Sequence, residues 1–591
     1  MHRAAVWALS LWLSWSVGAM AQSAGADDAI LAGAWSREQV EAIAAKTLEL
    51  HLPFARDELH AAERRAVEEL LAAGQRLHDL YLRQRHPQAL AARAALARRP
   101  DRRDLADLFR TMKGPIATTL ENERVPFLGV APETPARNVY PPSLERAAFD
   151  AYLDAHPERR DELLHPRSAV REATPENVRR ALAALDAHPA LDLLHPGLRE
   201  RLASADAYVA VPYSVAYADD LLFVYERLHA AAEHVEEVDE AFARYLRLRA
   251  RDLLTDDYDG GDATWVTARF TGSLNAQIGS YETYDDALYG VKTFFGLALL
   301  QRDAARTAEL AAAVRDIQAI EDRLPYDSRK TVRSDIPVGV YNVIADFGQT
   351  RGTNTATILP NESHLSRQFG RTIMIRANIL THPALFARSR AAFNAATVAA
   401  HHDDLTPEGA LYRTLWHEIG HYLGVDRTVD GRELDAALQD AADLLEEMKA
   451  DLVSLFAAAW LHEQGLHSGA RLRAIYADGI RRVLQTNRPR RDQPYQTMQL
   501  IQWNWFLDRG LLAMEGGRLR IDYDRYAEAV TSLLAEVLEL QSRGDRDAAN
   551  AFVERWTTWD ESLHGEIARA IRAAETTRFT LVRYEALNER P

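Results

Sequence analysis

The chain has 591 residues, of which 47% are hydrophobic and 26% charged, a composition typical of a globular protein with a sizeable core. Its formal net charge of −16 argues against nucleic acid or an anionic membrane surface as a partner. The absence of cysteine excludes disulfides, thiolate metal ligands and a cysteine-linked lipid anchor. The length predicts about two to four domains.

The first 21 residues have the parts of an export signal. His2 and Arg3 form a short positive region, and residues 4–17 form an apolar stretch that is too short to span a membrane. Ala19-Met20-Ala21 then matches the small-residue pattern of a signal-peptide cleavage site. We therefore expect cleavage after Ala21, a periplasmic or secreted location, and no membrane association of the mature protein.

The remaining chain divides by composition into three stretches. Residues 22–255 carry mostly helical periodicity, and residues 256–365 are richer in strand signals. Within them, residues 264–271 and 338–345 hold many β-branched and aromatic side chains, which predicts strands. Residues 366–591 read as almost entirely helical. We predict a predominantly α-helical α+β fold, with a mixed α/β lobe over 22–365 that contains a small sheet or barrel, and a helical lobe over 366–591.

Residues 417–421 read His-Glu-Ile-Gly-His, the HExxH pattern of a metal site. Histidines four residues apart lie on one face of a helix, where both imidazoles can bind one metal ion, and Glu418 between them can act as a general base. Thr406 is a good N-cap, Pro407 suits the first helical position, and Gly424 is a plausible stop. The pattern therefore predicts a metal-binding helix between these signals.

A third ligand is needed to complete such a site. In the HExxHxxGxxH pattern a third histidine would stand at position 427, but Arg427 has no lone pair to donate. Residues 432–464 predict an amphipathic helix whose polar side gathers Asp440, Asp443, Glu447, Asp451 and Ser454. This side is either a solvated acidic face or the source of Glu447 as the third ligand, and spacing alone does not separate the two.

The pairing of His417-Glu-Ile-Gly-His421 with Glu446-Glu-Met-Lys-Ala-Asp451 resembles the dipeptidyl-peptidase III family of zinc metallopeptidases. Much of that family has HExxGH, and a bacterial and plant branch has the shorter HExxH found here. The resemblance implies one Zn²⁺ per chain, bound by His417, His421 and Glu447. It also implies that Glu446 and Asp451 orient the ligands from behind, and that two lobes are separated by a cleft.

Other segments extend the resemblance over residues 40–515. Residues 278–290 are similar to a family segment that implies a substrate-binding role for Glu282 and a catalytic role for Tyr284 beside the scissile carbonyl. Residues 351–362 are similar to a segment that holds the substrate N-terminus, which implies this role for Asn361, whereas Ile358 replaces a family asparagine. By its spacing to Gly510, Tyr495 stands where the family has a substrate-binding histidine.

Together, these features predict an exported zinc metallopeptidase that hydrolyses short peptides with a zinc-activated water. Glu418 is expected to move the proton and Tyr284 to donate to the developing oxyanion. Two alternatives stay open: a zinc hydrolase of a non-peptide substrate on the same scaffold, and a non-catalytic zinc-containing peptide-binding protein. Ile358 and Tyr495 are the departures from the family that leave the specificity for dipeptide release open. The sequence makes no prediction of the oligomeric state.

Overall fold

The computed structural model describes residues 28–327, 329–332, 337–349, 353–359, 365, 368–490 and 493–588. The predicted signal peptide therefore lies outside the described residues. The fold is predominantly α-helical with small mixed sheets, as predicted, with 58% helix and 13% strand. The chain forms two compact units: unit 1 comprises Met1–Leu300, Ile344–Gly352 and Thr577–Pro591, and unit 2 comprises Gln301–Val343 and Thr353–Thr576.

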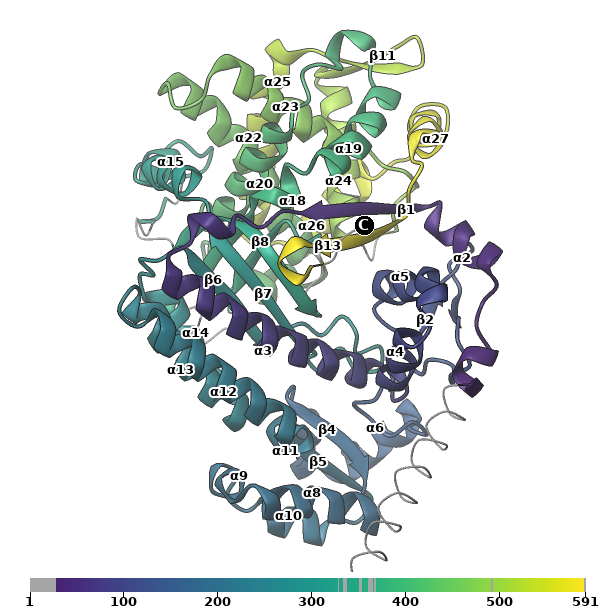
Figure 1. Cartoon of the computed structure of the whole chain (residues 1–591). Helices are drawn as coiled ribbons and strands as arrows, with labels where there is room; N and C mark the ends of the chain where they lie inside the picture. Colours follow the sequence, from purple (N-terminus) through teal and green to yellow (C-terminus); the bar gives the residue numbers. More distant parts are fainter. Residues whose placement is uncertain are drawn as a thin grey trace, which may run out of the picture. The chain divides into compact units, whose positions relative to one another are not determined.

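Unit 1 is built around three long helices, of which α12 packs against both α3 and α13 (Figure 1). Short two-stranded sheets surround them: β1 pairs in parallel with β13, while β2–β3 and β4–β5 are antiparallel. The helices are α2 Arg37–Ala44, α3 Ala61–Arg85, α4 Ala89–Ala97, α5 Arg103–Met112, α6 Arg146–Ala155, α7 Arg160–Leu163, α8 Pro175–Ala187, α9 Pro189–Leu194, α10 Leu198–Ser204, α11 Tyr213–Ala216, α12 Ala218–Val235, α13 Glu240–Thr255 and α14 Asp259–Thr267. The strands are β1 Thr47–Leu52, β2 Ile116–Thr118, β3 Arg124–Pro126, β4 Ser168–Glu172, β5 Tyr208–Pro212, β6 Leu274–Ser280 and β13 Phe579–Tyr584.

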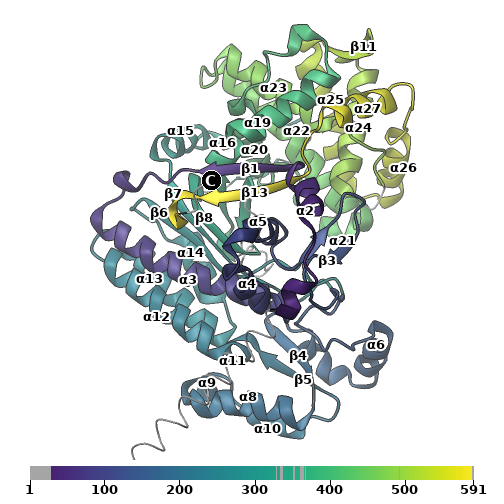
Figure 2. The ribbon, with the colours of Figure 1, turned by 45° about the vertical axis from the view of Figure 1, so that its right-hand side comes forward.

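Unit 2 is a helical body in which α22 contacts α20, α23, α24 and α25 (Figure 2). Most residues of α20 and α22 are buried, so both helices belong to the core of unit 2. The helices are α15 Ala304–Val314, α16 Ile317–Glu321, α18 Ala377–Leu380, α19 Pro383–Ala396, α20 Pro407–Gly420, α21 Leu434–Leu438, α22 Ala442–Glu463, α23 Gly469–Val483, α24 Pro494–Asp508, α25 Tyr526–Arg543, α26 Arg546–Trp556 and α27 His564–Ala574. The strands are β9 Ala356–Leu359, β10 Thr372–Arg376, β11 Leu512–Glu515 and β12 Arg518–Ile521.

One five-stranded sheet has the order β6-β7-β8-β10-β9. Strand β10 pairs in parallel with β8 and antiparallel with β9. The chain passes from one unit to the other within β7 (Phe295–Arg302) and within β8 (Val338–Gly348). The predicted strand at residues 338–345 is therefore part of β8.

Two predicted elements differ from the structure. The strand expected at residues 264–271 is wrong, because residues up to Thr267 complete α14 and the next strand, β6, begins at Leu274. Trp265 and Val266 are buried on α14, and the Trp265 indole donates to Asn275 at 2.9 Å, so tertiary burial overrides strand propensity. The helix expected over 432–464 is interrupted at Gln439, whose φ of 52° no α-helix accommodates. Among the described residues, no helix has both the length and the apolar character that a membrane span requires.

Candidate metal centre

Helix α20 carries the HExxH motif and begins as predicted. The Thr406 side chain accepts a hydrogen bond from the Gly409 backbone N–H at 3.3 Å, and Pro407 occupies the first helical position. At its other end α20 lies directly on α22, since a Cβ added to Gly420 would stand 3.0 Å from the Ala450 carbonyl oxygen. The glycine inside the motif thus allows the two helix backbones to approach closely, which brings the histidines opposite the acidic helix.

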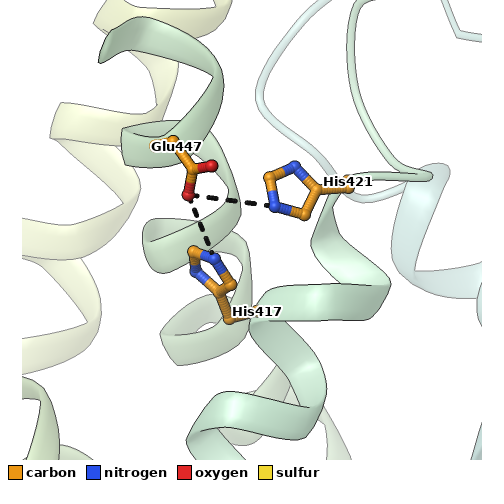
Figure 3. Close-up of side chains that lie close together, drawn as sticks. All are labelled: His417, His421 and Glu447. Atoms are coloured by element: carbon orange, nitrogen blue, oxygen red, sulfur yellow. Dashed lines mark ion pairs between the residues drawn. The ribbon is translucent and has the colours of Figure 1, made fainter. Parts of the chain in front are cut away.

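The three predicted ligands converge across this helix contact (Figure 3). Glu447 Oε2 lies 3.3 Å from His417 Nε2 and 3.9 Å from His421 Nε2, and the two imidazole rings stand at 85° to each other. One ligand atom from each residue lies within 4.8 Å of the others. Both histidines come from the end of α20 and Glu447 comes from α22, so these side chains lie close enough to bind one metal ion.

Each histidine also contacts a second carboxylate on its other ring nitrogen. His417 Nδ1 lies 2.7 Å from Asp451 Oδ1, and His421 Nδ1 lies 3.0 Å from Glu446 Oε1. A carboxylate accepts hydrogen bonds, so in a neutral imidazole it places the proton on Nδ1 and leaves the lone pair on Nε2. Both Nε2 lone pairs then point toward Glu447. Glu446 and Asp451 therefore contact the two histidines, and the orienting role that the resemblance implied for them stays a prediction.

These donors suit a divalent cation. Glu447 Oε2 is buried, and the Nε2 atoms of both histidines face it. Two imidazole nitrogens and one carboxylate oxygen are ligands that zinc uses in catalytic sites, with a fourth position left open. The same donor set also accepts cobalt or manganese. The residues present therefore fit a metal ion.

A buried arginine, Arg413, and a partly buried one, Arg482, contact Asp451. Arg482 Nε lies 3.1 Å from both of its carboxylate oxygens, and Arg413 NH1 donates to Oδ1 at 3.3 Å. Arg413 is also held by Asp478, whose Oδ2 accepts from Nε at 2.6 Å, and Asp478 Oδ1 accepts from Arg481 Nε at 2.5 Å. The carboxylate behind His417 is thus compensated by cations and fixed in position.

The carboxylate behind His421 has its own cation. Lys449 Nζ lies 2.8 Å from Glu446 Oε1, and Gln541 donates its amide to Glu446 Oε2 at 3.2 Å. Lys449 also donates to the backbone carbonyl of Leu423, three residues after the α20 terminus, at 2.7 Å. Both metal-facing histidines therefore have the same arrangement behind them, an anionic acceptor held by a cation.

The pKa shifts follow from these charges. Burial opposes the charged form of His417, but Asp451 and Glu447 outweigh it and raise the pKa of His417 to about 9. Burial also opposes ionisation of Glu446, yet Lys449 and His421 lower the pKa of Glu446 to about 2. Without a metal, a proton on His417 supplies the positive charge that the carboxylates favour, and a binding metal ion displaces it.

Two further predicted residues lie in unit 2 near the ligands. Glu418 follows His417 on α20, is half-buried, and adds to the negative potential that raises the His417 pKa. Tyr495 lies on α24, is half-exposed, and donates its hydroxyl to Glu447 Oε1 at 2.9 Å. The contact of Tyr495 with a metal ligand was not predicted; its expected substrate-binding role stays a prediction.

The other predicted substrate residues are placed less fully. Glu282 and Tyr284 follow β6 in unit 1, where Tyr284 is 69% exposed and the Glu282 carbonyl accepts from Phe294 N at 3.2 Å. Asn361 lies outside the described residues. The backbone of Ile358 pairs with Ile373 across β9 and β10.

Sequence reasoning missed the cations that hold the orienting carboxylates. Arg413 stands four residues before His417, and Lys449 stands three residues after Glu446, so helical spacing places each on the side of the residue it supports. Arg482 and Asp478 come from α23, and no local pattern pairs that helix with α20 and α22.

The comparisons with known proteins address the fold. No protein-family model matches the chain. The structure of dipeptidyl-peptidase III from Caldithrix abyssi superposes with a TM-score of 0.77 at 23% identity, covering 93% of this chain and 99% of that chain. The enzyme from Corallococcus sp. strain EGB gives a TM-score of 0.69 at 24% identity, covering 94% and 98%. The chain has the dipeptidyl-peptidase III fold.

This fold confirms the resemblance that the motif pair indicated. A curated protein, Nudix hydrolase 3 of Arabidopsis thaliana, is 26% identical over 433 residues, which are 72% of this chain and 54% of that protein. The chain thus spans about half the length of the curated relative it matches. In the dipeptidyl-peptidase III fold of this chain, the candidate metal centre lies wholly within unit 2.

Proposed function

We propose that the protein is a zinc-dependent peptidase that hydrolyses short peptides, with release of dipeptides from a free N-terminus as its specific form. The observation that carries the proposal is the convergence of His417, His421 and Glu447, with Glu418 on the same helix turn. The dipeptidyl-peptidase III fold supports peptide hydrolysis over other zinc chemistry, because both similar structures carry that name.

The roles of the site residues follow from their chemistry. Zinc held by the three ligands supplies Lewis-acid polarisation of a carbonyl and makes water more acidic. Glu418 takes a proton from the attacking water and delivers it to the leaving amine, the work of a general base that then acts as an acid. Asp451 and Glu446 keep the histidines oriented, so that no reorganisation of the ligands accompanies the reaction.

The substrate residues are assigned from the resemblance. Tyr284 donates a hydrogen bond to the oxygen that becomes negative during attack, and its high exposure leaves the side chain accessible to a ligand. Glu282 and Asn361 hold the N-terminal end of the peptide, the first by its charge and the second by its amide. Tyr495 adds a hydroxyl beside the metal ligand Glu447, where it can also contact the substrate.

We place the mature enzyme in the periplasm or outside the cell. The support is the sequence of residues 1–21, with its positive start, apolar stretch and Ala-x-Ala site. Cleavage after Ala21 is measured by sequencing the N-terminus of the protein recovered from a secretion-competent host. An N-terminus at Met1 contradicts this location.

A substrate panel tests the activity. The purified protein is incubated with aminoacyl, dipeptidyl and N-acetyl-dipeptidyl arylamides and with internally quenched peptides, with and without a zinc chelator. We expect hydrolysis of the dipeptidyl substrates with a free amino group, loss of activity with chelator, and recovery when zinc is added back. A non-chelating isomer of the chelator controls for non-specific inhibition.

The other outcomes separate the alternatives. Cleavage of the quenched peptides alone identifies an endopeptidase and contradicts dipeptide release. Binding of zinc and peptide without cleavage identifies the non-catalytic peptide-binding alternative. Binding of zinc with no effect of any peptide overturns peptide hydrolysis and leaves a hydrolase of a different substrate class.

A further inference from the structure

The two histidines of the candidate metal centre are fixed by different means. His417 lies inside the last turn of α20, whose last helical residue is Gly420, so its backbone keeps helical geometry. His421 is the C-cap residue, and the chain leaves the helix immediately after it through a turn that ends at Gly424, with φ of 81°. The position of His421 therefore depends on what holds this turn.

A single buried side chain holds the turn and the partner of His421 together. The Lys449 ammonium donates to the Leu423 carbonyl at 2.7 Å and lies 2.8 Å from Glu446 Oε1. That Glu446 oxygen is the one that lies 3.0 Å from His421 Nδ1. Lys449 is 1% exposed, so its charge is compensated by these protein oxygens and not by solvent.

The packing around the turn matches the Lys449 side chain. A Cβ added to Gly424 would stand 3.0 Å from Lys449 Cδ, so the lysine stem passes directly over the glycine. On the other side, Gly424 N donates to Glu321 Oε2 at 2.8 Å. The end of the metal-binding helix is therefore clamped between Glu321 and Lys449, and only Lys449 also reaches a carboxylate that contacts a ligand.

We propose that Lys449 is a positioning residue for metal binding, which fixes His421 through the Leu423 carbonyl and through Glu446. The inference rests on the proposed function, because it takes His421 as a metal ligand. It goes beyond that function in naming the residue that determines how firmly the second histidine is held. Loss of the ammonium leaves the Leu423 carbonyl without this donor, and leaves Glu446 held only by the Gln541 amide on its other oxygen, so the contact of Glu446 with Nδ1 weakens.

The test measures zinc and does not depend on turnover. Zinc affinity and release rate are determined by competition with a chromophoric chelator for the wild type, Lys449→Met and Lys449→Gln. We expect Lys449→Met to bind zinc about 10–100-fold more weakly, the range found when groups behind metal ligands are removed. Lys449→Gln should lose less zinc affinity than Lys449→Met, because its amide can still donate to one acceptor. If Lys449→Met does not fold, the zinc affinity of Lys449→Gln tests the inference.

A matched control separates positioning from a general loss of stability. Lys292 in unit 1 is equally buried and is held by three oxygens, the carbonyls of Leu163 and His165 at 2.7 Å and Ser168 Oγ at 2.9 Å. Lys292→Met should destabilise the protein and leave zinc affinity unchanged, because all three metal-facing residues belong to unit 2.

The outcomes distinguish this inference from the proposed function. Wild-type zinc affinity in a folded Lys449→Met or Lys449→Gln protein overturns the inference alone. Weaker binding in Lys292→Met by the same factor also overturns it, because the effect is then general. A wild-type protein that binds no zinc overturns the inference and the proposed function together, whereas a zinc-binding protein without peptidase activity overturns only the function.

Discussion

Replacing Asp451 with asparagine keeps the shape of the side chain and removes the charge that lies 2.7 Å from His417 Nδ1. The amide can present its NH₂ group to the ring or accept only a weaker hydrogen bond, so His417 loses the anion that orients it. Loss of such a partner lowers metal affinity by about 10–100-fold. We therefore expect Asp451→Asn to bind zinc about 10–100-fold more weakly than the wild type.

Asp451→Asn should lower the stability of the protein only moderately, because the arginines around Asp451 keep other partners. Removing one member of a buried ion pair costs about 3–5 kcal/mol when the remaining charge is left uncompensated. In Asp451→Asn, Arg413 keeps Asp478 at 2.6 Å, and the side chain of Arg482 is 25% exposed and can reach water. We therefore expect a loss of about 2 kcal/mol in the free energy of unfolding, below the full range.

Asp478→Asn is the matched comparison, because it should lose more stability and less zinc affinity than Asp451→Asn. Asp478 is fully buried and holds both Arg413 and Arg481, so its neutralisation leaves Arg413 with one carboxylate contact, the 3.3 Å contact to Asp451. We expect the full loss of about 3–5 kcal/mol here, with a smaller change in zinc affinity, since no Asp478 atom contacts a histidine of the centre.

The assay measures both quantities on each variant. Zinc affinity comes from chelator competition, and stability comes from chemical denaturation of the metal-free proteins, which excludes stabilisation by bound zinc. Asp451→Asn should have the larger loss in affinity and Asp478→Asn the larger loss in stability. Equal zinc affinity in the two variants, or a larger loss in Asp478→Asn, refutes the assignment of Asp451 as the orienting group of His417.

Three further variants probe other contacts. Glu447→Ala removes the only ligand from α22 and should lower the zinc bound per chain sharply, as measured by elemental analysis after dialysis. Tyr495→Phe removes the hydroxyl that donates to Glu447 at 2.9 Å and should weaken zinc binding by a few-fold, about 1 kcal/mol, by chelator competition. Asp256→Asn should increase stability in a pH-dependent way. Burial raises the pKa of Asp256 to about 7 against the hydrogen bonds of Ser214, so its protonated form stabilises the fold at low pH, and this contribution is lost as pH rises through about 7. Asparagine does not ionise and tolerates the φ of 57° there, so denaturation at about pH 5 and about pH 8 should give the variant the larger advantage at the higher pH.

The contrary results are specific to each variant. Unchanged zinc stoichiometry in Glu447→Ala moves the third ligand elsewhere. Identical zinc affinity in Tyr495→Phe means that the hydroxyl does not hold the ligand in solution. An Asp256→Asn protein that is less stable than the wild type at the higher pH contradicts the cost assigned to the buried charge.

The helix that carries the HExxH motif was predictable because its signals are local. Thr406, Pro407 and the two histidines lie within one helix, and the structure places the cap and the histidine pair as the spacing predicted. The choice between an acidic surface and a ligand at Glu447 was not decidable from spacing. It depends on the tertiary packing of α22, which buries Asp451 to 4% exposure and half-buries Glu447, whereas Asp440 and Asp443 from the same predicted face stay exposed.

The errors come from interactions that sequence patterns do not contain. Residues 264–267 have strand-like composition, but the burial of Trp265 and its contact with Asn275 make them the end of a helix. The arginine network behind His417 and the double contact of Lys449 join α20, α22 and α23, which no local sequence pattern pairs. Such contacts follow from tertiary packing and are read only from the structure.

The most direct test of the central claim is a parallel measurement of zinc content and dipeptidyl arylamide turnover on Glu418→Gln and the wild type. The substitution leaves all three ligands in place and removes only the carboxylate that moves the proton. We expect equal zinc content in both proteins and a loss of at least about 10²-fold in turnover by the variant. Full turnover in Glu418→Gln with zinc bound contradicts the assignment of this site as the catalytic centre.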